Sequence, residues 1–191
     1  MIPAALVAGW IALAAPWVSG GTRARYAADI AAAAPSETIA KAMVATAITE
    51  SDFRPAIERC ECKAGECDPD ASGIPRAVGL FQLHRYHYRG HSPAEICRSN
   101  RLAAELAAHA LMGLVARTGG VEEALRVYVG VSVRRGDRRV KRRLDLFALL
   151  MTPRLVAEPA EGDPELTGRN ELDRRADALE GDAQHEHRWK R

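Results

Sequence analysis

A glutamate stands where a helical pattern otherwise places apolar side chains. Residues 36–50 begin with a serine and a glutamate, which is a typical start of a helix. A helix turns by about 100° per residue, so Ile39, Met43 and Thr46 share one face with Glu50. That face is the one expected to pack on the core. We therefore predict that Glu50 is partly buried in the last turn of this helix.

Burial and the helix end both act on the charge of this carboxyl group. Leaving water disfavours the ionised form, and the negative end of the helix dipole disfavours a second negative charge. Both effects are expected to keep the proton on Glu50 near neutral pH. Such an acid can protonate a leaving oxygen, as the cleavage of a glycosidic bond requires. The alternative is a surface glutamate at a frayed helix end.

A second group of chemically active side chains lies in the segment HRYHYRGH. The spacing of His84, His87 and His91 suits a metal, but no acidic fourth ligand is adjacent. The aromatic faces of Tyr86 or Tyr88 could stack on sugar rings. We predict polar and aromatic ligand contacts here, with no metal. Solvated loop residues are the alternative.

Four cysteines surround a loop that contains glycine and aspartate, CECKAGECDPD. An even number of cysteines in this setting favours two disulfides and an oxidising compartment. Three pairings are possible, and the sequence does not choose between them. We favour Cys62–Cys67 with Cys60–Cys97, since a bridge between Cys60 and Cys62 is sterically difficult. The alternative is a zinc knot, although the C-x-C-x4-C spacing matches no common zinc pattern.

The elements that must position these residues are helices. Little of the chain alternates β-branched and polar residues, so we expect a mainly α fold with few or no strands. The predicted helices cover residues 22–34, 36–50, 99–117, 121–130 and 140–151. On the last of them, the residues expected to face the core are Val140, Leu144, Phe147 and Met151.

Three parts of the chain differ in composition. Residues 1–21 carry no charged side chain and could be a secretory signal, a membrane anchor or a packed helix. Residues 22–153 contain the predicted helices and form the expected functional domain. Residues 154–191 are rich in charge and poor in large apolar side chains, so we expect a mobile tail.

The charge of the chain is nearly balanced, at +2, and by itself implies no polyanionic partner. The basic run at residues 134–143, RRGDRRVKRR, is expected to be a solvated helix face and the turn before it. It could also attract anionic envelope polymers or phospholipid headgroups. This leaves open a non-enzymatic structural or adaptor protein, such as a phage virion component that binds the envelope or nucleic acid. Nucleic acid is not the partner that we predict.

Three short fragments follow one another between the predicted helices. They are Glu-Ser-Asp-Phe at 50–53, Gly-Leu-Phe-Gln at 79–82 and Val-Tyr-Val-Gly at 127–130. Together they resemble the soluble lytic transglycosylases and goose-type lysozymes, which carry an E-S-x-F helix end, a G-L-x-Q turn and an A-Y-N-x-G segment. The resemblance covers residues 24–150. It implies a lysozyme-like helical domain, with the cysteine loop as an insertion beside a groove for peptidoglycan strands, and no metal or cofactor.

The resemblance also implies roles for single residues. Glu50 matches the catalytic acid, and Ser51 matches a hydroxyl that holds substrate and orients that acid. Gly79 and Leu80 match a tight turn beside the groove. The remaining matches are Gln82, whose amide would fix an N-acetyl group or hydroxyl, and Tyr128, a tyrosine at the cleft floor. Tyr86 is added as an aromatic sugar contact.

The sequence departs from the family pattern at several points. Val129 stands where the family has asparagine, so one substrate-binding amide is missing or supplied elsewhere. Val127 replaces a small alanine, and the cysteine loop lengthens the interval between Glu50 and Gly79. These differences bear on the substrate that is preferred more than on the class of reaction.

The reaction implied by the resemblance breaks the β-1,4 bond between N-acetylmuramic acid and N-acetylglucosamine. Glu50 would protonate the bridging oxygen, and the sugar's own 6-hydroxyl would close a 1,6-anhydro ring without water. Glycosidases usually need a second carboxylate, and Asp52 is expected to point away from the Glu50 face. The alternative is a hydrolytic lysozyme or endolysin in which Asp68 or Asp70 activates water.

The setting of the protein follows from the same features. The cysteines, the apolar N-terminus and the resemblance predict an extracytoplasmic protein of the periplasm or cell envelope. Association with a membrane or a virion is compatible with this prediction. Cell-wall remodelling, phage lysis and phage entry would all use the same residues, and the sequence indicates no oligomeric state.

Overall fold

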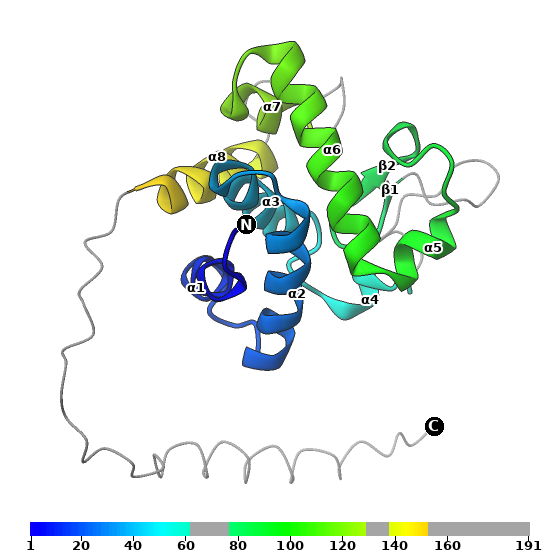
Figure 1. Cartoon of the computed structure of the whole chain (residues 1–191), viewed down its shortest axis with the longest axis horizontal. Helices are drawn as coiled ribbons and strands as arrows, with labels where there is room; N and C mark the ends of the chain where they lie inside the picture. Colours follow the sequence, from blue (N-terminus) through cyan, green and yellow to red (C-terminus); the bar gives the residue numbers. More distant parts are fainter. Residues whose placement is uncertain (62–76, 129–137, 153–191) are drawn as a thin grey trace, which may run out of the picture. The chain divides into compact units, whose positions relative to one another are not determined.

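The computed structural model describes residues 1–61, 77–128 and 138–152, which belong to one unit spanning Met1–Pro153. These residues are mainly helical, as predicted (Figure 1). The helices are α1 (Ala4–Ala14), α2 (Gly20–Ala33), α3 (Glu37–Glu50), α4 (Pro55–Glu58), α5 (Pro93–Arg98), α6 (Asn100–Thr118), α7 (Val121–Val127) and α8 (Arg138–Met151). The strands are β1 (Ala77–Val78) and β2 (Leu83–His84), followed by the 3-10 turn η1 (Arg85–His87). The lysozyme-like groove stays a prediction.

Helix α3 lies in the middle of the domain. It begins as predicted, with the side chain of Ser36 accepting a hydrogen bond of 3.3 Å from the backbone N–H of Ile39. It contacts α1, α2, α6, α7 and α8. Its predicted core stripe is confirmed, because Ile39, Met43 and Thr46 are all buried.

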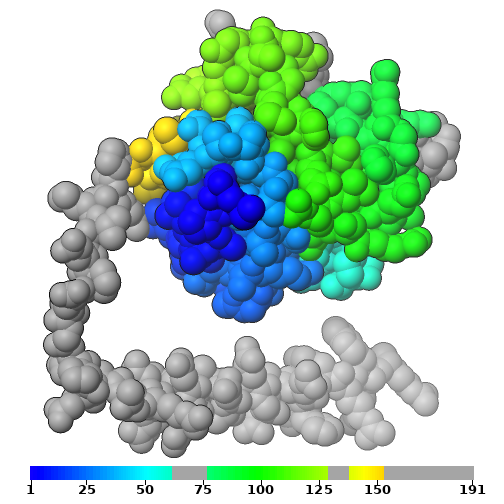
Figure 2. Space-filling view, in the orientation of Figure 1, coloured from blue at the N-terminus to red at the C-terminus, as the bar shows by residue number. Residues whose placement is uncertain are grey.

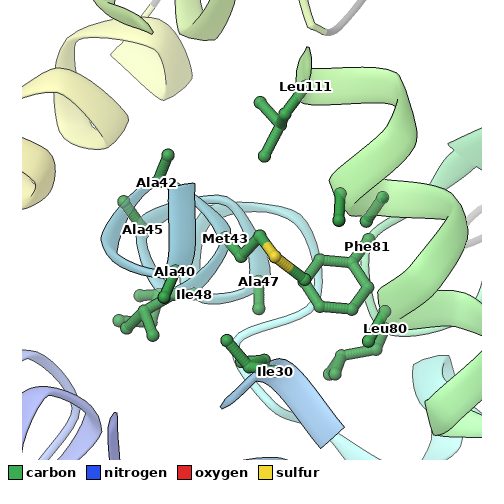
Figure 3. Packing of buried hydrophobic residues seen from close by; sticks show 14 of the residues in the cluster. Ile30, Ala40, Ala42, Met43, Ala45, Ala47, Ile48, Leu80, Phe81 and Leu111 are labelled. Carbon is green, nitrogen blue, oxygen red and sulfur yellow. The ribbon is translucent and has the colours of Figure 1, made fainter. Parts of the chain in front are cut away.

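The core around α3 is built from alanine and a few large side chains. Ala40, Ala45 and Ala47 are fully buried, and their small size lets neighbouring helices approach α3 closely. Met43 and Phe81 belong to the same core cluster, shown in Figure 3. Helix α3 is therefore held on several sides at once, which fixes the position of its last turn.

The N-terminal segment forms helix α1, which packs on the domain. Val7 and Ile11 are fully buried, and α1 contacts α2, α3 and α8. Of the three alternatives for this segment, a packed helix is the arrangement that the structure contains. Within the described part of the chain, no helix has both the length and the apolar character that crossing a bilayer requires.

Helix α6 has the boundaries that its sequence predicts. The Ser99 side chain accepts a hydrogen bond of 3.2 Å from the backbone N–H of Leu102, which caps the start. Gly119 ends the helix in the left-handed conformation, with φ of 82°.

A short hairpin follows the cysteine loop. Strands β1 and β2 pair antiparallel, with Ala77 opposite His84 and Val78 opposite Leu83. The turn between them begins at Gly79, whose φ is +70°. A Cβ atom there would lie 3.2 Å from Cγ2 of Ile96. The predicted turn is confirmed, and its glycine is needed both for its backbone conformation and for close packing on α5.

One predicted disulfide is confirmed. Cys60, after α4, is bonded to Cys97 in α5, with their Cα atoms 5.6 Å apart. The bond ties the entry of the cysteine loop to the helix that packs on α6. Cys62 and Cys67, which form the other predicted pair, lie outside the described residues.

The predicted buried face of α8 is wrong in one important respect. Met151 is 41 % exposed, and the fully buried position on this helix is Arg143. The buried side chains of α8 are Val140, Arg143, Phe147 and Leu150. The apolar residues of α8 are spaced so that either of two adjacent faces of the helix is a candidate for burial. The face that is buried contains Arg143, and an arginine is not expected in a core. Residues 154–191, predicted as a tail, lie outside the described residues.

We expect the Cys60→Ser/Cys97→Ser variant to lose about 2–4 kcal/mol of unfolding free energy, because the bond closes a long chain segment. Urea denaturation measures this loss. The matched control is Cys62→Ser/Cys67→Ser, whose predicted bond would close a much shorter loop and should stabilise less. Equal stability of the Cys60→Ser/Cys97→Ser variant and the unaltered protein would contradict the prediction.

Candidate active site

Glu50 occupies the last turn of α3, and the predicted partial burial is confirmed. Only 7 % of its side chain is exposed. One carboxylate oxygen, Oε1, accepts a hydrogen bond from Nη2 of Arg143, so the two side chains form a buried ion pair. The pair joins the end of α3 to α8, which is remote in sequence.

Arg143 is held by several groups in addition to Glu50. Its side chain has no exposed surface. Nε donates to Oγ1 of Thr49 at 3.0 Å, and Nη1 donates to the backbone carbonyl of Leu125 at 3.0 Å. These contacts fix the guanidinium between α3, α7 and α8, and they satisfy donors that would otherwise be costly to bury.

Arg143 is a site residue that the basic sequence pattern did not indicate. The basic run 134–143 is expected to be a solvated face, and for Arg143 this prediction is wrong. A usable signal was present, because Arg143 lies three residues after Val140 and four before Phe147, on the apolar stripe of α8. A charged residue at such a position requires a partner, and the buried glutamate of α3 is the matching charge.

The ion pair also changes the expected charge of Glu50. Burial and the helix dipole disfavour the carboxylate, but a guanidinium within hydrogen-bonding distance favours it strongly. The expectation that burial and the helix end alone set the charge of Glu50 therefore left out Arg143, whose guanidinium acts in the opposite direction.

Tyr128, directly after α7, connects the ion pair to the Gly79–Gln82 turn. It is 2 % exposed, and its hydroxyl donates to the carbonyl of Phe81 at 3.3 Å. The guanidinium carbon of Arg143 lies 5.6 Å from the centre of its ring. Burial, followed by the negative charge of Glu50, raises the pKa of Tyr128 above its ordinary value, so the phenol remains a hydrogen-bond donor.

The turn residues have mainly local roles. Gln82 has φ of 46°, and its Nε2 donates to the carbonyl of Gly79 at 3.0 Å, which closes the turn. Leu80 is 1 % exposed and belongs to the core cluster in Figure 3. The predicted substrate contact of Leu80 is therefore not available in this structure, whereas Gln82 is only partly buried.

Ser51 and Asp52 end the helix that carries Glu50. Ser51 is 1 % exposed, donates to the carbonyl of Ala47 at 2.9 Å and accepts from the N–H of Phe53 at 3.3 Å. Asp52 has φ of 54° and pairs with Arg142 at 3.3 Å. Asp52 is thus engaged at the surface with Arg142, while Ser51 shapes the end of α3 from inside the protein, where its predicted contact with substrate is not available.

Four aromatic rings run outward from the buried end of α7. The ring of Tyr128 stacks on His87 with centroids 6.0 Å apart, and His87 lies 4.1 Å from Tyr86. Tyr86 in turn stacks with His84 at 5.7 Å and is 49 % exposed. This aromatic row leads from the neighbourhood of the ion pair to the surface.

His87 is the polar centre of the aromatic row. Burial, followed by the charges of His84 and Arg117, lowers the pKa of His87 to about 4. Its Nε2 atom is buried and has no hydrogen-bond partner among the described residues. Within residues 1–61, 77–128 and 138–152, no three side chains of the types His, Cys, Asp and Glu gather as metal ligands would.

Comparison with protein-family models, curated proteins and solved structures gives no match to this chain. The resemblance to lytic transglycosylases therefore stays a prediction that rests on the three sequence fragments.

We expect Arg143→Met to destabilise the protein by about 3–5 kcal/mol, because it leaves the Glu50 carboxylate buried without its cation. Changing Glu50 to Gln in the same chain should recover part of this loss. Urea denaturation of both single variants and the double variant gives the coupling energy, expected at about 1–3 kcal/mol. Strictly additive losses would show that the two side chains do not stabilise each other.

We expect His87 to remain neutral well below the ordinary range of histidine, because its pKa is lowered to about 4. The unfolded chain takes up this proton near pH 6.5, as free histidine does. The unfolded state therefore binds more protons between these values, and His87 should make the fold less stable as pH falls through that window. Proton NMR of the imidazole ring measures its titration midpoint, and a midpoint near 6.5 would contradict the burial of His87.

Proposed function

We propose that the protein cleaves peptidoglycan at the β-1,4 bond between N-acetylmuramic acid and N-acetylglucosamine, with Glu50 as the catalytic acid. The proposal includes a lysozyme-like groove beside Glu50 and an extracytoplasmic site of action. The closed Cys60–Cys97 bond suits an oxidising compartment. The resemblance of the three fragments provides the class of reaction, and the contacts around Glu50 provide the physical support.

The observation that carries the proposal is a chain of contacts that joins the three fragments. Glu50, from the first fragment, pairs with Arg143. Arg143 lies over the ring of Tyr128, from the third fragment, and Tyr128 donates to Phe81 of the second. The contact between Tyr128 and Phe81 spans 47 residues and that between Glu50 and Arg143 spans 93, so segments remote in sequence meet at one helix end. Unrelated matches of a few residues would have no reason to converge in this way.

The charges near Glu50 suit a mechanism with one carboxylate. Asp52 is 42 % exposed and pairs with Arg142, so it is not placed to activate water beside Glu50. In the proposed reaction, the acetamido group of N-acetylmuramic acid stabilises the cationic sugar after the bridging oxygen leaves with a proton from Glu50. The Glu50 carboxylate then takes the proton of the 6-hydroxyl as that oxygen bonds to the anomeric carbon. No water is consumed.

Arg143 imposes a condition on this mechanism. Because the guanidinium favours the ionised carboxylate, Glu50 must gain a proton before it can act as an acid. In the proposed cycle, the glycan approaches the small exposed part of Glu50 and weakens its contact with Arg143. After the leaving oxygen is protonated, the returning contact with Arg143 stabilises the carboxylate that acts as the base.

The aromatic row is the proposed sugar-binding surface. Tyr86 is the exposed member, and a flat ring presents an apolar face that fits the C–H groups of a pyranose. The imidazole of His87 packs beside Tyr86, with ring centroids 4.1 Å apart, and because it stays neutral it adds no positive charge to this surface. Among the predicted contacts, Tyr86 and Gln82 are the ones whose side chains reach solvent.

One observation favours a second candidate. A buried Glu–Arg pair with further hydrogen bonds is also what a purely structural connection between α3 and α8 looks like. In that case the protein would be a non-enzymatic envelope or virion component, and Glu50 would matter only for stability.

We expect Glu50→Gln to abolish the release of soluble fragments from purified peptidoglycan, because an amide cannot transfer the proton. The matched control is Glu58→Gln. Glu58 is equally buried, at 5 % side-chain exposure, and is ion-paired with Arg25, so the same chemical change is made away from the site. Both variants are assayed below their melting temperatures. Loss in Glu50→Gln with retention in Glu58→Gln supports the enzyme. Activity that survives in Glu50→Gln, or no activity in the unaltered protein, excludes it.

Mass spectrometry of the released fragments separates the two reaction types. We expect 1,6-anhydro ends, whose mass is lower by one water than that of the hydrolysed product. Products that contain the added water would instead favour the hydrolytic alternative, in which Asp68 or Asp70 activates water. Both aspartates lie outside the described residues.

A further inference from the structure

Most of the exposed large apolar side chains of the described structure lie in or next to two neighbouring helices, α1 and α8. These exposed side chains are Met1, Leu6, Trp17, Tyr86, Leu149 and Met151. Tyr86 belongs to the aromatic row, and the other five lie in or next to α1 and α8. These two helices contact each other, and Figure 1 shows them on the same side of the domain. Scattered single apolar residues are normal on a surface, but a concentration of this kind marks an interaction site.

Helix α1 contributes a surface with no polar side chain at all. Its sequence is AALVAGWIALA, and only Val7, Ile11 and Ala14 are buried. Leu6 is 39 % exposed, and Trp17, three residues after the helix, is 56 % exposed. Figure 2 shows α1 in dark blue at the surface of the domain. A surface helix usually has a polar outer face, so the outer face of α1 suits a partner that is not water.

The outer face of α8 adds cations. Arg138, Arg139, Lys141 and Arg142 are exposed, and they occupy the first part of the helix. Further along, the exposed side chains are apolar, with Leu149 and Met151. A hollow of about 390 Å³ on this helix is lined by Arg138, Lys141, Arg142, Asp145, Leu146 and Leu149. Cations, leucines and one acid, Asp145, therefore share one surface depression, in which Arg142 is also paired with Asp52.

We propose that the α1–α8 face, defined by these five exposed apolar residues and the four cations of α8, docks on the surface of an anionic lipid bilayer. The apolar side chains enter the boundary between headgroups and acyl chains, and the cations contact lipid phosphates. The binding is interfacial, because α1 has 11 residues and is about 16 Å long, which is too short to cross the hydrocarbon layer.

The composition of the face distinguishes a bilayer from other occupants. Nucleic acid would use the cations but not the exposed leucine, methionine and tryptophan side chains. A second copy of the chain, packed through the same face, would bury the cations of α8 in an interface to which α8 itself contributes one exposed acid, Asp145. An anionic bilayer satisfies both the apolar and the charged part. The proposal does not depend on peptidoglycan cleavage, since Glu50 takes no part in it.

The test is co-sedimentation of the full-length protein with large unilamellar vesicles. One set contains phosphatidylglycerol and phosphatidylcholine in equal amounts, and the other contains phosphatidylcholine alone. We expect binding to the anionic vesicles that is at least tenfold tighter than to the neutral ones and that weakens with added salt. Equal binding to both sets, or no binding to either, would overturn the proposal.

Two variants assign the binding to this face. Arg138→Glu/Lys141→Glu reverses two exposed cations, and Leu6→Ser/Trp17→Ser removes apolar surface. Each should weaken binding to the anionic vesicles at least tenfold, since one cation near such a membrane contributes about a fivefold effect. The matched control is Arg89→Glu/Arg98→Glu, which makes the same change in net charge at exposed residues in and next to α5, away from α1 and α8 in Figure 1.

The control should retain most of the binding, with only the loss that its altered net charge produces. Losses that are equal in the control and in Arg138→Glu/Lys141→Glu would refute a specific face.

Two further measurements test the competing occupants. A dimer in light scattering that Leu6→Ser/Trp17→Ser dissociates would show that a second copy covers the face. Tighter binding to a short DNA duplex than to the vesicles, at the same salt, would show a nucleic-acid surface.

Discussion

The buried ion pair between Glu50 and Arg143 is the constraint around which the domain is arranged. Neither charge tolerates burial alone, so α3 and α8 must meet in the one register that brings the two groups together. Arg143 then uses its other donors on Thr49 and on the backbone of Leu125, which places the end of α7 as well. A contact between two side chains thus determines how α3, α7 and α8 meet around one point.

The neighbourhood of this pair is supported by two further polar arrangements. Tyr128 links the ion pair to the hairpin turn, because its hydroxyl donates a hydrogen bond to the carbonyl of Phe81. The side chain of Gln82 closes that turn. At the other side of the domain, Glu58 accepts from Arg25, Tyr26 and Asn100, and the adjacent Cys60 is bonded to Cys97. Two buried glutamates in one small domain therefore have different surroundings. Glu50 leads toward an aromatic row and the surface, whereas Glu58 joins α2, α4 and α6.

The domain presents two outer regions with different chemistry. The aromatic row contains an exposed tyrosine, Tyr86, and a histidine that stays neutral, His87, which suits a neutral polar ligand such as a sugar. The α1–α8 face combines apolar side chains with cations, which suits an anionic amphipathic surface. If both proposals hold, the two regions would position the protein at a membrane while it acts on a glycan nearby. Each region is built from its own residues, so either can fail without the other.

The sequence by itself determined helices α2, α3, α6, α7 and α8, the starts of α3 and α6, and the buried stripe that ends at Glu50. These follow from local patterns, namely helix caps and a period of 3.6 residues. It favoured the Cys60–Cys97 pair without excluding another pairing, and only the fold decides that choice. Only the tertiary structure decided which phase of α8 is buried, that Arg143 neutralises Glu50, and that Leu80 belongs to the core. The surroundings of Glu50 include Arg143, which is 93 positions away in the sequence. No local sequence pattern shows that these two residues lie next to each other in space. Pairing of remote charges is decided by how whole helices pack, because the free energy of each charge depends on every group that replaces its water.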